Sequence, residues 1–277
     1  MFSGIELVYY DVHMQSCDID LAKGRKTLII THCQEGRIEF EYKNGEYLYL
    51  ASGDLSIQKN TENIRHRYCP LSHYHGVSVA IDMNRVPRCF SCILDDVFVS
   101  PEELEMKFCS EKPYSIMREN ISIEHIFSEL YSVPENIRKG YHKVKVLELL
   151  LFLSGLDYKG ESEERRYFSR SQVTAAKEAK KYLLAHLDEH ITITELADML
   201  GISSTSLKIC FKGVYGDTIN GYITNCKMQK AASLLKNTDK SVLEIAGIVG
   251  YNNGSKFAGA FRRVMNKSPN EYRKSLV

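Results

Sequence analysis

The feature that most constrains this chain is an internal repeat in its last hundred residues. Two stretches match at an offset of 49 residues and then, after a one-residue insertion, at an offset of 50. The first match aligns Leu196, Ala197, Leu200 and Gly201 with Ile245, Ala246, Val249 and Gly250, and the second aligns Phe211, Val214, Asn220 and Tyr222 with Phe261, Val264, Asn270 and Tyr272. Self-similarity at a fixed offset indicates a duplicated supersecondary unit.

Each copy has the residues of a helix-turn-helix. The small side chain of Ala197 allows two helices to approach closely, and Gly201 can take the positive φ of a sharp turn. The wedge between the helices is expected to be filled by Leu196, Leu200, Ile202, Leu207 and Cys210. Capping boxes of the form S/T-x-x-E predict three helix starts, at Thr192, Ser241 and Ser268. Apolar residues near helical spacing over 219–235 predict a connecting helix between the two units.

Charge is divided unevenly along the chain. From Val173 to the end there are 15 Lys and Arg against nine Asp and Glu, a balance of +6, so the remainder holds 21 basic and 26 acidic residues, a balance of −5. A basic segment joined to an acidic one is typical of a polyanion-binding module attached to a different module. Two units in register, with matched caps and this charge, favour DNA binding over a structural helical array.

On these residues, the segment 173–277 resembles the DNA-binding domain of the AraC/XylS family of bacterial transcription regulators. The most specific part of the likeness is 242–274, VLEIAGIVGYNNGSKFAGAFRRVMNKSPNEYRK. The resemblance implies two helix-turn-helix units joined by a linker helix, with both second helices in successive major-groove segments of DNA. The N-terminal region is similar, more loosely, to the cupin-like effector-binding and dimerisation module of the family, through the stretch YLYLASGDLSI.

The resemblance also implies which residues contact DNA. Its base-contacting positions are Thr205, Lys208, Ile209, Ser255, Lys256 and Gly259. Lysine donates to guanine O6 and N7, a hydroxyl bonds either base type, and isoleucine offers apolar contact to a thymine methyl. Farther along the second helices, the expected phosphate contacts are Lys212, Arg262 and Arg263, which position the protein without reading sequence. The first recognition helix is expected over 204–214, with Ser203 as its N-cap.

The chain departs from the family at three of its positions. Arginine is frequent where this sequence has Ile209, Gly259 and Lys227. Neither isoleucine nor glycine can replace the bidentate contact of arginine to guanine. Specificity is therefore expected to depend on DNA shape or on dimerisation across two sites, with affinity supplied by phosphate contacts.

The N-terminal part has the period-two alternation of strands from Ile5 to about Asp82. Asn44-Gly45 favours a type I′ hairpin turn, and Ser52-Gly53-Asp54 predicts a second turn. A small antiparallel sandwich or barrel is expected. The apolar stretch 141–156 predicts a helix buried on more than one side, which either packs under the barrel or forms a dimer seam.

We therefore expect an α+β protein of two domains. Residues 1–156 are expected to form a cupin-like antiparallel β-barrel with a helical dimerisation segment. The polar stretch 157–171 is the expected linker. Residues 172–277 are expected to form an all-α domain of two helix-turn-helix units joined by a linker helix.

Candidate ligand-binding residues of the first domain follow the GDLSI turn: His66, His73, Tyr74 and His75. They are expected to line a small-molecule effector pocket. His73 and His75 project to one face of a strand, and two imidazoles with a third ligand can hold zinc or iron, as cupin enzymes do. Because GDLSI is followed by Gln58-Lys59-Asn60 and not by the proline and glycine of those enzymes, ordinary hydrogen-bonded histidines are favoured, and no metal or cofactor is expected. A structural role is favoured for the lone Cys89-x-x-Cys92 pair.

Catalytic motifs are lacking: the sequence has no G-x-S-x-G, no P-loop and no dinucleotide fingerprint, so an enzyme is not expected. The longest apolar run, 149–153, is far shorter than the ~18 residues of a membrane span, and the acidic first twenty residues oppose a signal peptide, so the cytoplasm is expected. Expected partners are double-stranded DNA, a small-molecule effector, a second copy of the chain and RNA polymerase, with no membrane. The alternatives are a cupin-type metalloenzyme fused to a helical domain, and a helical domain that binds a protein.

Overall fold

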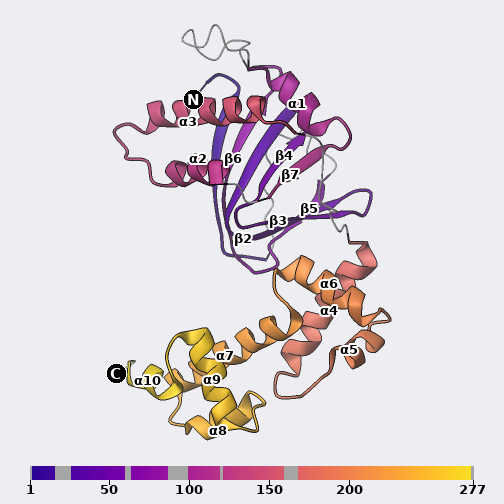
Figure 1. The fold of residues 1–277 in the computed structure, drawn as a ribbon, viewed down its shortest axis with the longest axis vertical. Helices are drawn as coiled ribbons and strands as arrows, with labels where there is room; N and C mark the ends of the chain where they lie inside the picture. Colours follow the sequence, from indigo (N-terminus) through magenta and orange to yellow (C-terminus); the bar gives the residue numbers. More distant parts are fainter. Residues whose placement is uncertain are drawn as a thin grey trace. The chain divides into compact units, whose positions relative to one another are not determined.

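The computed structural model describes residues 2–15, 26–59, 64–86, 99–118, 121–158 and 168–275. These residues form two compact units, which divide between residues 167 and 168. In the described residues the first unit combines β-strands with three helices, and the second contains helices only (Figure 1). The chain is thus of the expected α+β class. No helix in the described ranges is both long and apolar enough to cross a membrane.

Every strand pairing in the first unit is antiparallel, as the alternating sequence predicts. The strands are β1 (Ile5–Val12), β2 (Thr27–Tyr42), β3 (Tyr47–Ala51), β4 (Leu55–Lys59), β5 (Ile64–Tyr68), β6 (Tyr74–Asp82) and β7 (Tyr114–Met117). The order across the sheet is β1-β6-β2-β4-β7, and β3 and β5 pair with the second half of the long strand β2. The long strand β2 therefore joins two groups of strands.

Both turns predicted in this region are present, but the first is not the expected type I′ turn, because Asn44 lacks the positive φ that this turn type requires. Gly45 has a φ of +86°, and its N–H donates to the carbonyl of Tyr42 at 3.0 Å in the hairpin between β2 and β3. Gly53 has a φ of +81° in the turn that precedes β4. Positive φ at these two positions is what glycine supplies without steric cost.

Helices α1 (Pro101–Cys109), α2 (Ile121–Tyr131) and α3 (Arg138–Gly155) complete the first unit. They share one apolar core with the sheet, which includes Ile30, Val79, Phe127, Leu149 and Leu150. The predicted helix 141–156 corresponds to α3, which begins at Arg138. Of its two expected roles, packing against the strands accounts for its buried face, while Ile137 before its first turn and Val144 remain exposed.

The second unit consists of seven helices in its described part: α4 (Arg170–Ala185), α5 (Ile193–Met199), α6 (Ser204–Tyr215), α7 (Ile219–Asn237), α8 (Val242–Ile248), α9 (Gly254–Met265) and α10 (Pro269–Lys274). Helix α7 contacts α4 and α6, and also α8, α9 and α10 (Figure 1). It is the connecting helix that the sequence predicts.

The expected linker 157–171 lies partly outside the described residues, because 159–167 are not among them. Its last residues belong to the helical unit. Phe168 is buried there, and α4 begins at Arg170 behind a capping box formed by Ser169 and Gln172. The helical unit therefore begins a few residues before the expected boundary, because an N-cap and a buried aromatic ring close the polar stretch.

Candidate nucleic-acid interface

The same turn joins the two helices of each repeat. Gly201 has a φ of +66°, and the next N–H, of Ile202, donates to the carbonyl of Ala197 at 3.1 Å. Gly250 has a φ of +77°, and the next N–H, of Tyr251, donates to the carbonyl of Ala246 at 2.8 Å. Helix α6 begins three residues after its glycine and α9 four residues after its own, which confirms the one-residue insertion.

All three predicted capping boxes are formed. The hydroxyls of Thr192, Ser241 and Ser268 accept from the N–H groups of Glu195, Glu244 and Glu271 at 3.2, 3.2 and 3.3 Å. The three carboxylates accept in return from the cap N–H groups, at 2.8, 2.7 and 2.7 Å. These hydrogen bonds lower the pKa of each glutamate, because they favour its charged form.

The recognition helices are capped as well. Ser203 accepts from the N–H of Ser206 at 3.2 Å at the start of α6, as expected. Asn253 accepts from the N–H of Lys256 at 2.9 Å at the start of α9. The sequence reasoning missed this second cap, although asparagine is among the strongest N-cap residues and its position follows from the offset of 50.

One face of each recognition helix is held in the core. The buried residues are Leu207, Cys210, Phe211, Val214 and Tyr215 in α6, and Phe257, Ala260 and Phe261 in α9. The two units also share an equivalent contact between aromatic rings. Phe211 meets Tyr222 at 5.6 Å and 76°, and Phe261 meets Tyr272 at 5.5 Å and 82°. Both pairs have the edge-to-face geometry that aromatic quadrupoles favour.

The expected DNA-contacting residues lie away from that core. Thr205, Lys208 and Lys212 are exposed and spaced three and four residues apart on α6, so they share one face, with Ile209 half-buried beside them. On α9 the exposed residues are Ser255, Lys256, Gly259, Arg262 and Arg263. The two helices together carry five of the expected cations: Lys208, Lys212, Lys256, Arg262 and Arg263. In the described part of the chain, none of the five forms an ion pair within 4.0 Å. Each recognition helix thus presents an exposed face with free basic groups.

The expected effector residues are not brought together. Along β6 the side chains alternate, so buried Tyr74 points into an apolar cluster with Cys33, Phe40 and Leu50. His73 and His75 face the other side of the strand, where both approach Glu35. His66 is exposed on β5. The four side chains therefore do not line one pocket, because neighbouring residues of a strand face opposite sides.

The hydroxyl of Tyr74 is buried and has no hydrogen-bond partner among the described residues. A Cβ atom on Gly76 would lie 2.5 Å from that hydroxyl oxygen, so only glycine leaves room for it. Burial raises the pKa of Tyr74 well above its ordinary value, which keeps the hydroxyl neutral. It can therefore both donate and accept a hydrogen bond.

Comparison with known proteins gives the helical unit a family. Residues 196–275 match a family model described as a helix-turn-helix domain. The xylose operon regulatory protein of Escherichia coli K12 is 31% identical over 153 residues, which cover 52% of this chain and 39% of that protein. The melibiose operon regulatory protein of the same strain is 30% identical over 93 residues, 34% of this chain and 31% of that protein. The helical domain belongs to the AraC/XylS family.

The matched segments span less than half the length of both curated relatives. Among solved structures, the C-terminal domain of AraT from Geobacillus stearothermophilus is 32% identical to this chain, covers 36% of it and 84% of its own length, and has a TM-score of 0.36.

Lys227, where the resemblance led us to expect arginine, lies on the linker helix α7 of this domain. Its ammonium group lies 5.7 Å from the centre of the Tyr251 ring, and it is half-buried. Burial lowers the pKa of Lys227, and the nearby charge of Asp188 opposes that shift. Lys227 thus contacts residues of its own domain at the turn before α9.

Proposed function

We propose that this protein is a sequence-specific DNA-binding transcription regulator whose N-terminal domain responds to a small-molecule effector. One observation carries the proposal. Two helix-turn-helix units each present an exposed face with free cations, opposite a face locked in the core. The regulators to which the chain is similar support this function. The domain division proposed for it is 1–156, 157–171 and 172–277, with the last linker residues, 168–171, packed as part of the helical unit.

The proposed contacts follow the exposed faces. Lys208 and Lys256 would donate to guanine edges, and Thr205 and Ser255 to either base type. Ile209 is half-buried and would reach a thymine methyl only with its outer carbons. Close to the ends of the recognition helices, Lys212, Arg262 and Arg263 are suited to phosphates, whose contacts depend on charge and not on sequence.

For the effector, we propose the apolar interior around Tyr74. That cluster contains the buried rings of Phe40, Tyr42 and Tyr114, and the hydroxyl of Tyr74 can bond a polar group of a ligand. An effector would change DNA occupancy only through a different affinity for two states of the protein. The other three expected effector residues, His66, His73 and His75, are not included in this proposal.

A second copy of the chain is the proposed partner at α3. Ile137, the N-cap of α3, and Val144 are exposed apolar residues seven positions apart, and Val144 lies on the side of the helix opposite its core residues. A seven-residue spacing is that of a helix-to-helix seam. We propose a homodimer at this face, and Val144→Lys should lower the apparent mass in light scattering from that of a dimer to that of a monomer.

The remaining parts of the proposal follow from regulation of transcription. RNA polymerase is a proposed further partner. The cytoplasm is the proposed compartment, because bacterial DNA lies there. No catalytic activity is proposed. The cited relatives are regulators by name.

The test is DNA binding by the full chain, measured by fluorescence anisotropy after selection of bound sequences from a random duplex pool. Lys208→Ala and Lys256→Ala should each weaken binding by about 1–3 kcal/mol and relax specificity at one position. Lys212→Ala and Arg262→Ala should weaken all sequences alike and reduce the salt slope by about one each.

The matched controls are Lys181→Ala and Lys236→Ala, which remove one exposed charge each from α4 and α7. These two variants should bind like the unmodified protein. Unmeasurable affinity for duplex DNA at low salt, or a log-log salt slope near zero, would overturn the proposal and favour a helical domain that binds protein.

A further inference from the structure

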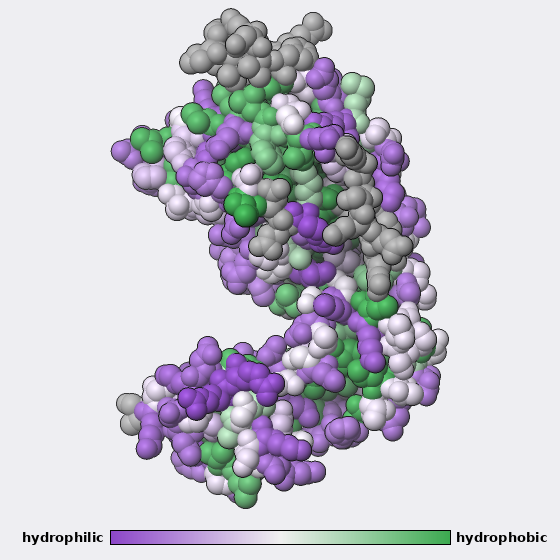
Figure 2. Space-filling model, viewed as in Figure 1, coloured by the Kyte–Doolittle hydropathy of each residue, from purple (hydrophilic) through white to green (hydrophobic). Residues whose placement is uncertain are grey.

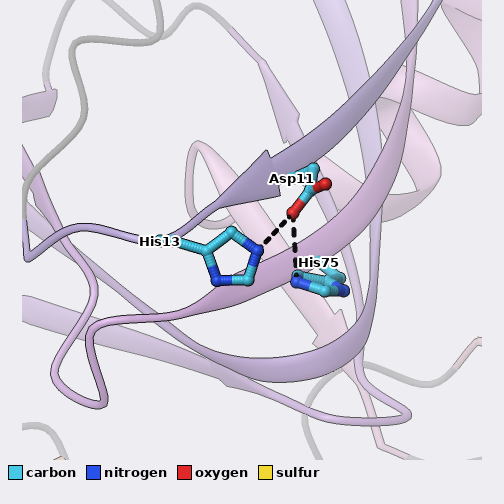
Figure 3. Close-up of side chains that lie close together, drawn as sticks. All are labelled: Asp11, His13 and His75. Carbon is cyan, nitrogen blue, oxygen red and sulfur yellow. Dashed lines mark ion pairs between the residues drawn. The ribbon is translucent and has the colours of Figure 1, made fainter.

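Three side chains with metal-ligating atoms meet at one end of strands β1 and β6 (Figure 3). The Nε2 atoms of His13 and His75 lie 2.8 and 3.2 Å from the same oxygen of Asp11, its Oδ1. The ligating atoms of the three residues all lie within 4.8 Å of one another. Two imidazoles and a carboxylate thus converge on one point.

The strand register explains how residues so distant in sequence come together. Asp11 of β1 lies opposite His75 of β6, and His75 lies opposite Glu35 of β2. Residues directly opposite in antiparallel strands have side chains on the same face. His13 directly follows β1 and His73 directly precedes β6, and their contacts with Asp11 and Glu35 place both rings on that side of the sheet.

His75 lacks the partner that a buried imidazole nitrogen ordinarily has. Its Nε2 is buried and makes no hydrogen bond within the described ranges, although Asp11 lies at ion-pair distance. A buried polar atom without a hydrogen bond carries a free-energy cost, which a bound cation would remove. This nitrogen points to a ligand that the three side chains would share.

A second pair of side chains surrounds this point. The carboxylate of Glu35 lies 3.9 Å from Nδ1 of His75 and 4.0 Å from Nε2 of His73. Gly36 permits the approach, because a Cβ atom there would lie 2.4 Å from the carbonyl oxygen of His73. Either residue is near enough to offer a fourth ligand after a side-chain rotation.

We infer that Asp11, His13 and His75 form a binding site for a divalent transition-metal ion, with Zn²⁺ as the best match. Zinc takes imidazole nitrogen and carboxylate oxygen in tetrahedral sites, and this donor set is poor for Ca²⁺ or Mg²⁺, which prefer oxygen alone.

The geometry needs only a small adjustment to hold the ion. Ligand atoms about 2.0–2.1 Å from a tetrahedral zinc ion lie about 3.3 Å from one another. The ligating atoms of Asp11, His13 and His75 lie within 4.8 Å of one another, so they would have to move closer together. The side chains of Asp11 and His13 are 76% and 68% exposed, so rotation about their own bonds is free. His75 is 31% exposed and is the more constrained ligand around which the others would close.

This site is new relative to the expectation from sequence. That expectation combined His73 and His75 with an unknown third ligand and favoured ordinary histidines. The structure adds Asp11 of β1 and His13, which directly follows that strand, both more than sixty residues before His75. The inference does not rest on the proposed function.

The experiment measures Zn²⁺ binding to the full chain without DNA, by competition with a chromogenic chelator. One Zn²⁺ should bind per chain, and His13→Ala and His75→Ala should each lower the affinity at least about tenfold. Co²⁺ in place of Zn²⁺ should give visible absorption of a tetrahedral site, which both variants should lose. Zn²⁺ should also raise the thermal midpoint of the unmodified protein more than that of His13→Ala.

Matched controls are His66→Ala and His125→Ala, which remove exposed histidines outside the cluster. Both should bind Zn²⁺ like the unmodified chain. Since His13 is exposed, its variant should fold even if that of His75 does not. Zn²⁺ affinity of His13→Ala equal to that of the unmodified chain, or no stoichiometric binding at all, would overturn the inference.

Discussion

The ring of Phe168 lies directly against Gly213 in the last turn of the first recognition helix, α6. A Cβ atom on that glycine would lie 2.1 Å from Cε2 of the ring and 2.2 Å from Cζ. Phe168 is buried, and it precedes α4 by two residues. The start of the helical domain is therefore packed onto α6 by one aromatic ring.

Gly213→Ala should destabilise the protein even though alanine is the better helix former. Alanine gains up to about 1 kcal/mol of helix propensity, but the methyl group would have to displace the Phe168 ring, at a cost of about 1–3 kcal/mol. Urea unfolding of the full chain, followed by far-UV circular dichroism, measures the change. A Gly213→Ala variant more stable than the unmodified protein would show that the ring moves freely.

Gly259→Ala should have the opposite effect on stability. This glycine lies within α9, is exposed, and a Cβ atom there would meet nothing within 4 Å. The free energy of unfolding should rise by up to about 1 kcal/mol. The same variant in the anisotropy titration shows whether DNA approaches the backbone at Gly259, since only close approach would make a methyl group weaken binding.

The two turn glycines should differ in their tolerance of alanine. At Gly201 the cost is limited to positive φ, about 1–2 kcal/mol, because a Cβ atom there has open space. At Gly250 a Cβ atom would also lie 2.7 Å from the carbonyl oxygen of Asp188. Gly250→Ala should therefore lower stability by at least about 1 kcal/mol more than Gly201→Ala in urea unfolding. Equal losses would indicate that the chain at Asp188 gives way.

Acid should weaken the first domain through His32. Its ring is stacked on Phe127 at 4.5 Å and its Nδ1 lies 3.5 Å from the hydroxyl of Tyr131. Burial lowers the pKa of His32 to about 4 from 6.5, so the unfolded chain takes up a proton in that window while the folded chain does not. Stability from this group is therefore complete above pH 6.5 and is lost as the pH falls towards 4.

Between pH 7.5 and 5 the loss from His32 should be about 2 kcal/mol. His142, whose pKa burial also lowers, contributes a further part. His32→Gln isolates the difference, because its stability should fall less over this interval, whatever its value at neutral pH. His66→Gln is the control on the surface. A His32→Gln variant with the same pH dependence as the unmodified protein would contradict the assignment.

The helical domain was largely predictable because its signals are local. Capping boxes, turn glycines and the one-residue insertion all lie within one repeat, and the second copy of each feature checks the first. The packing of Phe168 against Gly213, ahead of the expected boundary at residue 172, could not be predicted, because Phe168 is a lone aromatic residue in a polar stretch. The N-cap Asn253 could have been predicted from Ser203 and the offset of 50 residues between the repeats.

The first domain was less predictable because its important contacts join residues on different strands. The meeting of Asp11 with His75 depends on the register of β1 against β6, which hydrophobic alternation leaves undetermined by multiples of two residues. The expected effector residues are divided for a simpler reason. The alternation that puts His73 and His75 on one face puts Tyr74 on the other, so nearness in sequence does not place them together.

The shared helix α7 has a consequence for the DNA that this protein can read. It supplies Tyr222 to the ring pair of the first unit, and Met228, Ala231 and Leu235 to the core around Phe257 and Phe261 of the second. Neither unit can turn without moving the side chains that fill the other's interior. The distance between the two short sequences read by one chain should therefore be invariant. Five extra base pairs between the two short sequences are about half of a 10–10.5 base-pair helical turn, so they place one sequence on the far side of the duplex. Such an operator should be bound by only one unit at a time.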